Sequence, residues 1–242
     1  MNTEAGGRPG DARQATAAQR ERGRFITFEG TEGCGKSTQI RLLAGRLEQR
    51  GHVVRLLREP GGTPIGEEVR HTLKHSHKNH AMTPEAELLL MNASRAQLVR
   101  EVIQPALAAG EIVLCDRFHD STTVYQGYGR GLNLRVVQAM IDFAVGETRP
   151  DLTFLLSIPL AVSEARRRSR RASSPPSNGE PLRDRMDEAD RAFFDRVEKG
   201  YLAVAAAAPD RICVIDATRP IEAVASDIWN RAERLLEAAA PG

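Results

Sequence analysis

The sequence has few cysteines, no long apolar segment and almost no excess of charge of either sign. Its three cysteines, Cys34, Cys115 and Cys213, form an odd set without C-x-x-C spacing, which is typical of reduced thiols in the cytoplasm. No apolar run approaches the roughly 18 residues that a membrane-spanning helix needs. The formal net charge of +2 argues against the binding of bulk nucleic acid. We therefore expect a cytoplasmic protein that acts on neither membranes nor nucleic acids.

Hydrophobic residues make up 41% of the 242 residues, enough for one moderate α/β domain that folds without cross-links. Residues 1–22 have no apolar periodicity and lack the apolar core of a secretory signal. Glu4, Asp11 and Glu21 also interrupt the basic composition that is typical of a transit peptide. We predict a disordered tail over 1–22 and one folded domain over 23–242.

The most informative stretch is a glycine-rich loop with the sequence GTEGCGKS, residues 30–37. It follows an apolar segment and precedes a helical pattern, which is the context that a P-loop requires. Glycines let backbone N–H groups surround phosphate oxygens, and the helix N-terminus adds positive potential. Lys36 would reach the outer phosphates, and the Ser37 hydroxyl would bind Mg²⁺. The predicted ATP-binding residues are Gly30, Thr31, Glu32, Gly33, Cys34, Gly35, Lys36, Ser37 and Thr38. The alternative is an ordinary glycine turn.

Short apolar segments alternate with helical patterns along the chain. The predicted strands are 25–28, 53–57, 112–115, 152–156 and 212–215. Helices are expected from about 39, 64, 84, 133, 157, 187 and 221, and the one from 84 is expected to reach 107 with a bend near Pro105. This alternation indicates an α/β fold, a five-stranded parallel sheet flanked by helices. Right-handed crossovers bring all strand carboxyl ends to one edge, where open α/β sheets bind ligands.

Asp116 and Arg117 follow the third predicted strand at this edge. A carboxylate there can hold Mg²⁺ directly or through water, although it could instead cap the next helix. ATP-hydrolysing motors often have a glutamate next to that carboxylate, where it polarises water, but this chain has a cation. The pair Asp116-Arg117 therefore favours a second phosphate-bearing substrate over hydrolysis.

An arginine-rich run, 166–171, precedes a Ser-, Pro- and Gly-rich stretch, 172–179, that is typical of a mobile loop. We expect a lid over about 166–187 that closes over the phosphates and excludes water. One well-placed arginine can supply roughly 10³–10⁵ in the rate of phosphoryl transfer. The alternative is a solvated basic helix face. Together these features predict a kinase of a nucleoside monophosphate or another small metabolite.

Two other interpretations concern metal binding and nucleotide switching. His71 and His75 have the i, i+4 spacing of a metal site, but no acidic residue lies among the histidines of 71–80, which favours a solvated loop. A guanine switch would carry an Asn-Lys-x-Asp motif, which the sequence lacks. A partitioning ATPase would carry an extra lysine early in the P-loop, where this chain has Thr31 and Glu32.

Several segments together resemble the thymidylate kinases, which phosphorylate dTMP with ATP. They keep the order and spacing of that family over roughly 24–238 and are FEG at 28–30, REPGGT at 58–63, SRAQ at 94–97, DRF at 116–118, YQG at 125–127, RPDLT at 149–153, DRMD at 184–187 and IDA at 215–217. The resemblance implies the fold of a P-loop nucleoside-monophosphate kinase. It also implies ATP and dTMP as substrates, Mg²⁺ as cofactor and a homodimer.

The resemblance further implies which side chains hold the acceptor phosphate and sugar. Arg58, Arg70 and Arg117 would bind the dTMP phosphate, as bidentate guanidinium groups do. Glu32 would accept a hydrogen bond from the deoxyribose 3′-hydroxyl group. Tyr125 would pack where a ribose 2′-hydroxyl group would otherwise sit. Without the resemblance, Arg70 could be a surface residue and Tyr125 a plain core residue.

For the base, the resemblance implies that Arg95 donates to a thymine carbonyl and that Thr122 and Gln126 complete its recognition. Met91 stands where the family often has an aromatic residue that stacks on thymine, and it is a softer platform. Alone, Arg95 and Gln126 could equally be surface residues.

The position of the catalytic arginine follows from Gly33. Family members that resemble the eukaryotic enzymes have an arginine at this place in the P-loop, and this chain does not. The resemblance therefore implies a lid arginine, as in many bacterial members. Arg166 is the first candidate and Arg185 the second, with Lys36 and Arg117 completing the predicted catalytic set.

Overall fold

The computed structural model describes residues 22–76, 78–173 and 191–238. Residues 1–21 of the predicted tail and the part of the predicted lid from residue 174 to 187 lie outside this range, and so does Arg185. None of the helices within it combines the length and the apolar character needed to span a bilayer.

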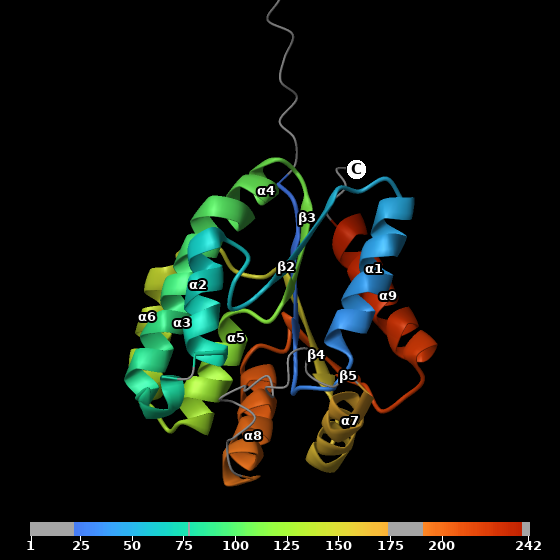
Figure 1. Cartoon of the computed structure of the whole chain (residues 1–242). Helices are drawn as coiled ribbons and strands as arrows, with labels where there is room; N and C mark the ends of the chain where they lie inside the picture. The colour runs from blue at the N-terminus through green and yellow to red at the C-terminus, as the bar shows by residue number, and fades with distance from the viewer. Residues whose placement is uncertain (1–21, 77, 174–190, 239–242) are drawn as a thin grey trace, which may run out of the picture.

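Strands and helices alternate along the described chain (Figure 1). The strands are β1 (Phe25–Glu29), β2 (Val54–Arg58), β3 (Ile112–Asp116), β4 (Leu152–Ser157) and β5 (Ile212–Asp216). The helices are α1 (Lys36–Gln49), α2 (Pro64–Lys74), α3 (Pro84–Leu98), α4 (Gln104–Ala108), α5 (His119–Thr122), α6 (Leu134–Val145), α7 (Leu160–Ser173), α8 (Arg191–Ala207) and α9 (Ile221–Glu237). A 3₁₀ turn, η1 (Asn79–Ala81), and two π-helical segments, η2 (Val99–Ile103) and η3 (Thr123–Gly129), complete the set.

The five strands form one parallel sheet in the order β2-β3-β1-β4-β5. The predicted α/β fold with a five-stranded parallel sheet is therefore confirmed. β1 lies at the centre and all five of its residues are buried, as expected of a strand covered on both faces. β2 and β3 lie on one side of β1, and β4 and β5, which follow them in the sequence, lie on the other. The strand order therefore changes direction at β1, and open α/β sheets bind ligands in the crevice at such a point.

Apolar side chains cover both faces of the sheet. Ile26 and Phe28 of β1 pack with α1 and α9 on one face, whereas Phe25 packs with α3 and α6 on the other. This division follows from the alternation of side chains along a strand. Figure 1 shows α1 and α9 on one side of the sheet and α2, α3 and α6 on the other.

The helix starts agree with their capping residues. The Thr63 side chain accepts from the amide of Gly66, and Thr83 caps α3 in the same way, each before a proline at the first helical position. α3, η2 and α4 together span the long helix expected from 84 to 107, with a π-helical segment inside it. The interpretation of 71–80 as a loop is wrong in part, because α2 continues to Lys74.

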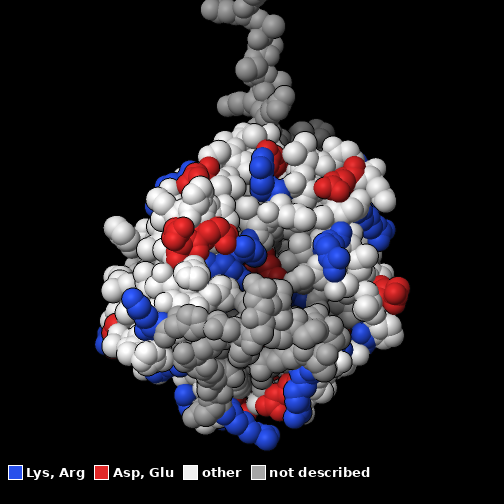
Figure 2. Space-filling view, in the orientation of Figure 1, with Lys and Arg blue, Asp and Glu red and all other residues white. Residues whose placement is uncertain are grey.

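On the face that Figure 2 shows, basic and acidic side chains are interspersed rather than gathered into one basic surface. That distribution agrees with the small net charge of the chain.

Candidate active site

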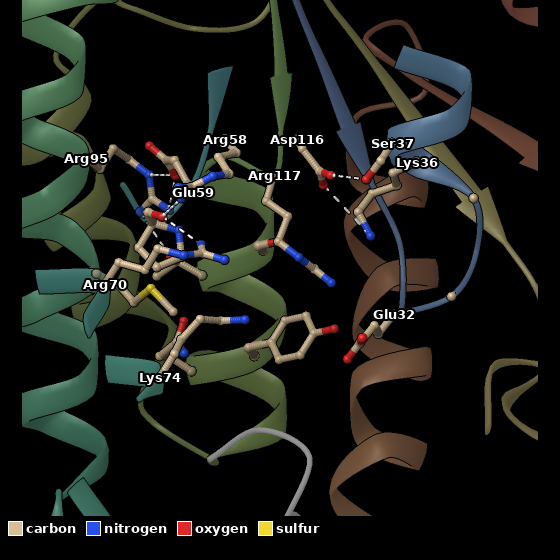
Figure 3. Close-up of a pocket in the computed structure, with 18 of the residues that line it drawn as sticks. Glu32, Lys36, Ser37, Arg58, Glu59, Arg70, Lys74, Arg95, Asp116 and Arg117 are labelled. Atoms are coloured by element: carbon tan, nitrogen blue, oxygen red, sulfur yellow. Dashed lines mark hydrogen bonds and ion pairs between the residues drawn. The ribbon is translucent and has the colours of Figure 1, made fainter. Parts of the chain in front are cut away.

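A cavity of about 480 Å³ opens at the carboxyl ends of the central strands. It is lined by every side chain that the resemblance assigns to dTMP, namely Glu32, Arg58, Arg70, Met91, Arg95, Arg117, Thr122, Tyr125 and Gln126. Of the predicted ATP-binding loop, the lining includes Glu32, Gly33, Gly35, Lys36, Ser37 and Thr38, and not Gly30, Thr31 or Cys34. Figure 3 shows Lys36 and Ser37 at one end, Arg70 and Arg95 at the other, and Arg117 between them.

The loop after β1 has the backbone of a phosphate-binding loop. Gly30 has a φ of 129°, and a Cβ atom there would lie 2.4 Å from the carbonyl oxygen of Leu156, so a side chain does not fit. Gly35 has a φ of 101° and caps the N-terminus of α1. Nζ of the buried Lys36 donates to the carbonyl oxygens of Gly30 at 3.1 Å and Thr31 at 3.3 Å. The ammonium group therefore lies inside the loop, where phosphate oxygens can replace these carbonyls.

Ser37 and Asp116 bring two oxygen atoms together beside this ammonium group. Ser37 Oγ donates to Asp116 Oδ2 at 3.1 Å, and Lys36 Nζ lies 3.9 Å from Asp116 Oδ1. Hydroxyl and carboxylate oxygens suit Mg²⁺, which keeps waters and substrate phosphates as its other ligands. The pair therefore fits a magnesium ion that arrives with a nucleotide. Within the described ranges, no three His, Cys, Asp or Glu side chains form a metal-binding group, and this includes His71 and His75.

Arg117 is fixed by both its backbone and its side chain. Its φ of 70° is uncommon for any residue except glycine, and its amide donates to Phe28 O at 2.9 Å. Its Nη1 donates to Ser121 Oγ and to the Tyr201 hydroxyl group, both at 3.1 Å. Its Cζ lies 5.1 Å from the centre of the Tyr125 ring. The guanidinium group is thus held in the middle of the cavity wall.

Arg58 and Arg70 converge on the turn after β2. Their Nη1 atoms both donate to Pro60 O, at 3.1 Å and 2.9 Å. Arg58 also pairs with Glu67 at 3.0 Å. The amide of Gly62, followed by Arg58, holds the pKa of the Glu67 carboxyl below its usual value. Two cations therefore stand side by side at the acceptor end, and neither is buried.

Arg95 is not a surface arginine, because its side chain is only 2% exposed. Its Nε and Nη2 donate to Glu59 Oε2 at 2.8 Å and 2.7 Å. Nη1 donates to Thr122 Oγ1 at 2.9 Å and to Asn92 Oδ1 at 3.2 Å, and Nη2 also donates to Phe118 O at 3.2 Å. All five N–H groups of the guanidinium are thereby used within the protein. Burial raises the pKa of the Glu59 carboxyl to about 7, although Arg95 opposes the shift.

Gln126, like Arg95, is held by a buried carboxylate. Its Nε2 donates to Glu87 Oε1 at 2.8 Å, and the fully buried Glu87 carboxylate also pairs with Arg130 at 3.0 Å. The amide oxygen and the second Nε2 proton of Gln126 then remain for other partners. Met91 lies one turn further along α3 than Glu87 and lines the same cavity.

Arg166 extends from α7 to the P-loop. Its Nη1 donates to Gly33 O at 3.2 Å, and its Nη2 donates to Ala217 O at 3.3 Å. Ser163, one turn earlier, donates to Glu32 O at 2.6 Å. Two side chains therefore attach α7 to the P-loop, and the Arg166 side chain lines the cavity there.

Comparison with known proteins adds to this geometry. The thymidylate kinase family profile matches residues 28–228. The chain belongs to the thymidylate kinase family. It is 48% identical over 205 residues to the thymidylate kinase of Syntrophotalea carbinolica, a match that covers 85% of this chain and 93% of that protein. It is also 48% identical over 206 residues to the thymidylate kinase of Geobacter sulfurreducens, covering 85% and 94%.

A crystal structure of thymidylate kinase from Ehrlichia chaffeensis has the same fold, with a TM-score of 0.67 and 31% identity over 87% of this chain and 98% of that one. The family resemblance inferred from the motifs is thus confirmed, as is the architecture of a P-loop nucleoside-monophosphate kinase.

The sequence motifs of the thymidylate kinase family did not identify the residues that hold the binding side chains in place. Glu29 and Glu59 stand inside two of the matching segments, yet Glu59 meets its arginine 36 residues away. Tyr201 is 172 residues from Glu29. Lys74, which also lines the cavity, falls in the segment expected to be a loop. In the sequence, Glu29 and Glu59 are recognisable only as charged residues at or near the end of an apolar strand. That position does not indicate which distant residue each of them contacts.

Proposed function

We propose that this chain transfers the γ-phosphoryl group of ATP to dTMP, giving dTDP and ADP, without a covalent enzyme intermediate. The observation that carries the proposal is the cavity that joins the P-loop to the arginines of the acceptor end. Two polyanionic nucleotides can meet end to end there, because loop amides and guanidinium groups offset the repulsion between their phosphates. Membership of the thymidylate kinase family supports dTMP as the acceptor.

On the donor side, the amides of residues 30–38 surround the ATP phosphates and Lys36 binds the outer ones. Ser37 and Asp116 are the residues that would hold Mg²⁺, and their 3.1 Å contact supports this assignment. An ion held there would supply positive charge that neutralises the ATP phosphates.

On the acceptor side, Arg58, Arg70 and Arg117 bind the dTMP phosphate through paired N–H groups. Glu32 accepts from the 3′-hydroxyl group of the sugar, and the ring of Tyr125 packs against the sugar face. The convergence of Arg58 and Arg70 on one carbonyl oxygen supports a shared phosphate site.

The base is recognised by groups whose orientation the protein has already fixed. Arg95 donates to a thymine carbonyl by sharing its two longest hydrogen bonds, those of 3.2 Å to Asn92 and Phe118. The Gln126 amide oxygen accepts from the thymine N3–H group. Thr122 holds the Arg95 guanidinium group beside the base, and Met91 forms the apolar platform beneath it.

Transfer is in line, and it depends on positioning and on stabilisation of charge on the moving phosphoryl group. Arg166 is the proposed lid arginine because it already reaches the P-loop. Arg185 is the second candidate.

A coupled assay of ADP release with dTMP, dUMP, AMP, CMP and GMP tests the proposal. We expect the highest kcat/KM with dTMP. Preference for a base other than thymine would contradict the substrate, and Met91 is the residue that would then account for it. ATP consumption at the same rate without any monophosphate would instead indicate a hydrolysing switch.

The proposal includes a homodimer in the cytoplasm. The thymidylate kinase resemblance and the exposed apolar residues on neighbouring helices support the homodimer, for example Leu89 on α3 and Phe143 on α6. Free cysteines at all three positions support a reducing compartment.

A further inference from the structure

The described residues hold Arg117 at one end of its guanidinium group. Within the described residues, its side-chain hydrogen bonds both come from Nη1, to Ser121 Oγ and to the Tyr201 hydroxyl group. The opposite edge, formed by Nε and Nη2, carries three of the five N–H groups of an arginine. This is an edge through which guanidinium groups bind carboxylate or phosphate oxygens in pairs.

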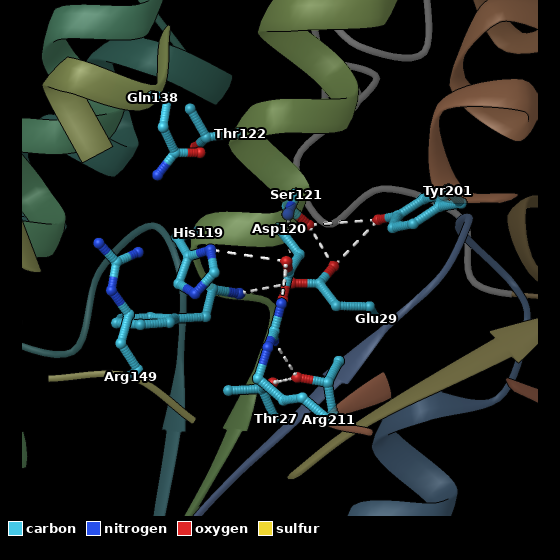
Figure 4. Close-up of polar contacts among 12 residues, drawn as sticks. Thr27, Glu29, His119, Asp120, Ser121, Thr122, Gln138, Arg149, Tyr201 and Arg211 are labelled. Atoms are coloured by element: carbon cyan, nitrogen blue, oxygen red, sulfur yellow. Dashed lines mark hydrogen bonds and ion pairs between the residues drawn. The ribbon is translucent and has the colours of Figure 1, made fainter. Parts of the chain in front are cut away.

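Glu29, at the end of β1, determines the direction of these hydrogen bonds. Its buried carboxylate accepts from the amides of Phe118 at 2.8 Å and Ser121 at 3.3 Å through Oε1. Its Oε2 accepts from Ser121 Oγ at 2.5 Å and from the Tyr201 hydroxyl group at 3.0 Å (Figure 4). A hydroxyl group has one proton to donate, and both hydroxyl groups donate theirs to Glu29. Their lone pairs are therefore available to accept from Arg117 Nη1.

The geometry points to Tyr201 as a positioning residue for phosphoryl transfer, whose hydroxyl group, together with that of Ser121, holds Arg117 so that its Nε–Nη2 edge faces the acceptor phosphate. This inference rests on the role proposed above for Arg117. Tyr201 is 5% exposed and is not among the residues that line the cavity, so it acts through Arg117 and not on the substrate.

The protonation of Tyr201 agrees with this assignment. Burial, followed by the charge of Glu29, raises the pKa of Tyr201 well above its usual value, so the phenol keeps the proton that it donates. Burial and then repulsion from Asp120 also raise the pKa of Glu29, while four donors compensate its charge.

The arrangement makes the position of Arg117 depend on a distant element. Tyr201 belongs to α8, whereas Glu29 ends β1 and Ser121 lies in α5. The Tyr201 ring also meets the Tyr125 ring edge to face, with centroids 6.2 Å apart. Because a misplacement of about 1 Å can cost about 10²-fold in rate, a single lost hydroxyl group should be measurable in turnover.

The substitution Tyr201→Phe removes only the hydroxyl group and keeps the ring contact. We expect kcat to fall by about 10- to 100-fold while KM for dTMP changes by less than about threefold, because an Arg117 that keeps only its hydrogen bond to Ser121 still binds the ground state. Tyr128→Phe is the matched control, since Tyr128 packs on Gly200 of α8 and takes no part in holding Arg117. It should leave kcat unchanged. Thermal unfolding of both variants separates loss of stability from loss of rate.

A double-mutant cycle that combines Tyr201→Phe with Arg117→Ala tests the role of Tyr201 separately from the role of Arg117. If Tyr201 acts through Arg117, Tyr201→Phe costs little further activity once Arg117 is removed. Additive losses, or wild-type kcat in Tyr201→Phe, would overturn the inference and leave the role of Arg117 intact. Wild-type kcat in Arg117→Ala would instead overturn the proposed role of that arginine. If Tyr201→Phe does not fold, Ser121→Ala takes its place in the same cycle with the same expectations.

Discussion

Buried carboxylates lie behind the polar side chains of the proposed acceptor site. Glu59 accepts twice from Arg95, and Glu87 accepts from Gln126, each at 2.8 Å or less. Burying a carboxylate costs free energy that is recovered only when its oxygens receive well-placed donors. Such pairs therefore contribute little to stability, but they fix the orientation of the cavity-lining side chain that donates to the carboxylate, here Arg95 or Gln126. Glu29 orients Arg117 indirectly, because it accepts from the Ser121 and Tyr201 hydroxyl groups, which in turn accept from Arg117.

The first prediction concerns the proposed lid arginine. Arg166→Ala should lower kcat by at least about 10²-fold, because one arginine that stabilises the moving phosphoryl group contributes roughly 10³–10⁵ in rate. KM for dTMP should change little, since Arg166 reaches the P-loop and not the acceptor arginines. Steady-state kinetics with both nucleotides measure the two effects.

Arg168→Ala is the control for Arg166→Ala. Arg168 is exposed on the same helix, two residues further on, and does not line the cavity. It should keep wild-type kcat. Unchanged turnover in Arg166→Ala would transfer the role to Arg185, which the same assay of Arg185→Ala tests.

A second prediction at the scale of one residue concerns His119 and pH. Burial lowers the pKa of His119 from 6.5 to about 4, although Asp120 opposes the shift. Between these values the unfolded chain binds more protons than the folded one, so the stability contributed by His119 is complete above pH 6.5 and is lost as the pH falls towards 4. The loss at pH 5 relative to pH 7 is about 2 kcal/mol. Glu59, with a pKa raised to about 7, acts in the opposite direction over pH 4.5–7.

The two groups are separated by comparing variants. His119→Asn removes the titration of residue 119 and leaves Glu59 in place. The free energy of unfolding is measured with urea at pH 7 and at pH 5. On going from pH 7 to pH 5, the wild type should lose about 2 kcal/mol more of this free energy than the variant does. Parallel pH profiles of the two proteins would show that His119 does not carry the shifted pKa.

At the scale of elements, the seating of α8 depends on a glycine. A Cβ atom at Gly200 would lie 2.9 Å from both Cβ and Cγ of Tyr128 on η3. The backbone of α8 at Gly200 therefore packs directly against the Tyr128 side chain. Gly200→Ala gains about 1 kcal/mol of helix propensity but overpacks the contact, which typically costs about 1–3 kcal/mol. We expect a net loss of stability, measured as a lower midpoint of urea unfolding.

Gly45→Ala is the matched control for this contact. Gly45 lies inside α1, and a Cβ atom there would meet no atom within 4 Å. The same substitution should therefore raise stability by about 0.5–1 kcal/mol. A gain in both variants would mean that α8 is not tightly seated on η3.

The elements that sequence reasoning located are those whose signals are local. The P-loop needs glycines at fixed places between a strand and a helix, and Thr63 and Thr83 cap their helices from the adjacent turn. The pairing of Glu59 with Arg95 and of Glu29 with Tyr201 is different, because it appears only when distant segments have folded together. Spacing along the chain carries no information about such contacts. They were therefore not predictable from one sequence.

At the scale of the whole molecule, short and mostly apolar segments that alternate with helical patterns were sufficient to predict a five-stranded parallel sheet, because the strands of such sheets are near-continuous apolar runs. The strand order β2-β3-β1-β4-β5 was not predicted, since several orders satisfy the same pattern. The order matters for function, because it places the end of β1 beside those of β3 and β4. The P-loop and Asp116 thereby share one crevice.

The last prediction concerns assembly. α2, α3 and α6 lie together on one side of the sheet in Figure 1, and each carries an exposed large apolar side chain, Ile65, Leu89 and Phe143 respectively. Phe143 is 84% exposed, so a partner that covers it would remove a large apolar surface from water. If a second copy of the chain packs on this side, Phe143→Asp should convert the dimer to a monomer, because it would bury an unpaired charge in the interface.

Light scattering coupled to size-exclusion chromatography measures the mass of each variant. Leu202→Asp is the control, since Leu202 is also exposed, at 56%, but lies on α8 and outside the three helices. It should remain a dimer. A wild-type chain that elutes as a monomer would contradict the proposed assembly. Dissociation of Leu202→Asp and not of Phe143→Asp would instead place the interface at α8, next to Tyr201, where it could alter the position of Arg117 and hence turnover.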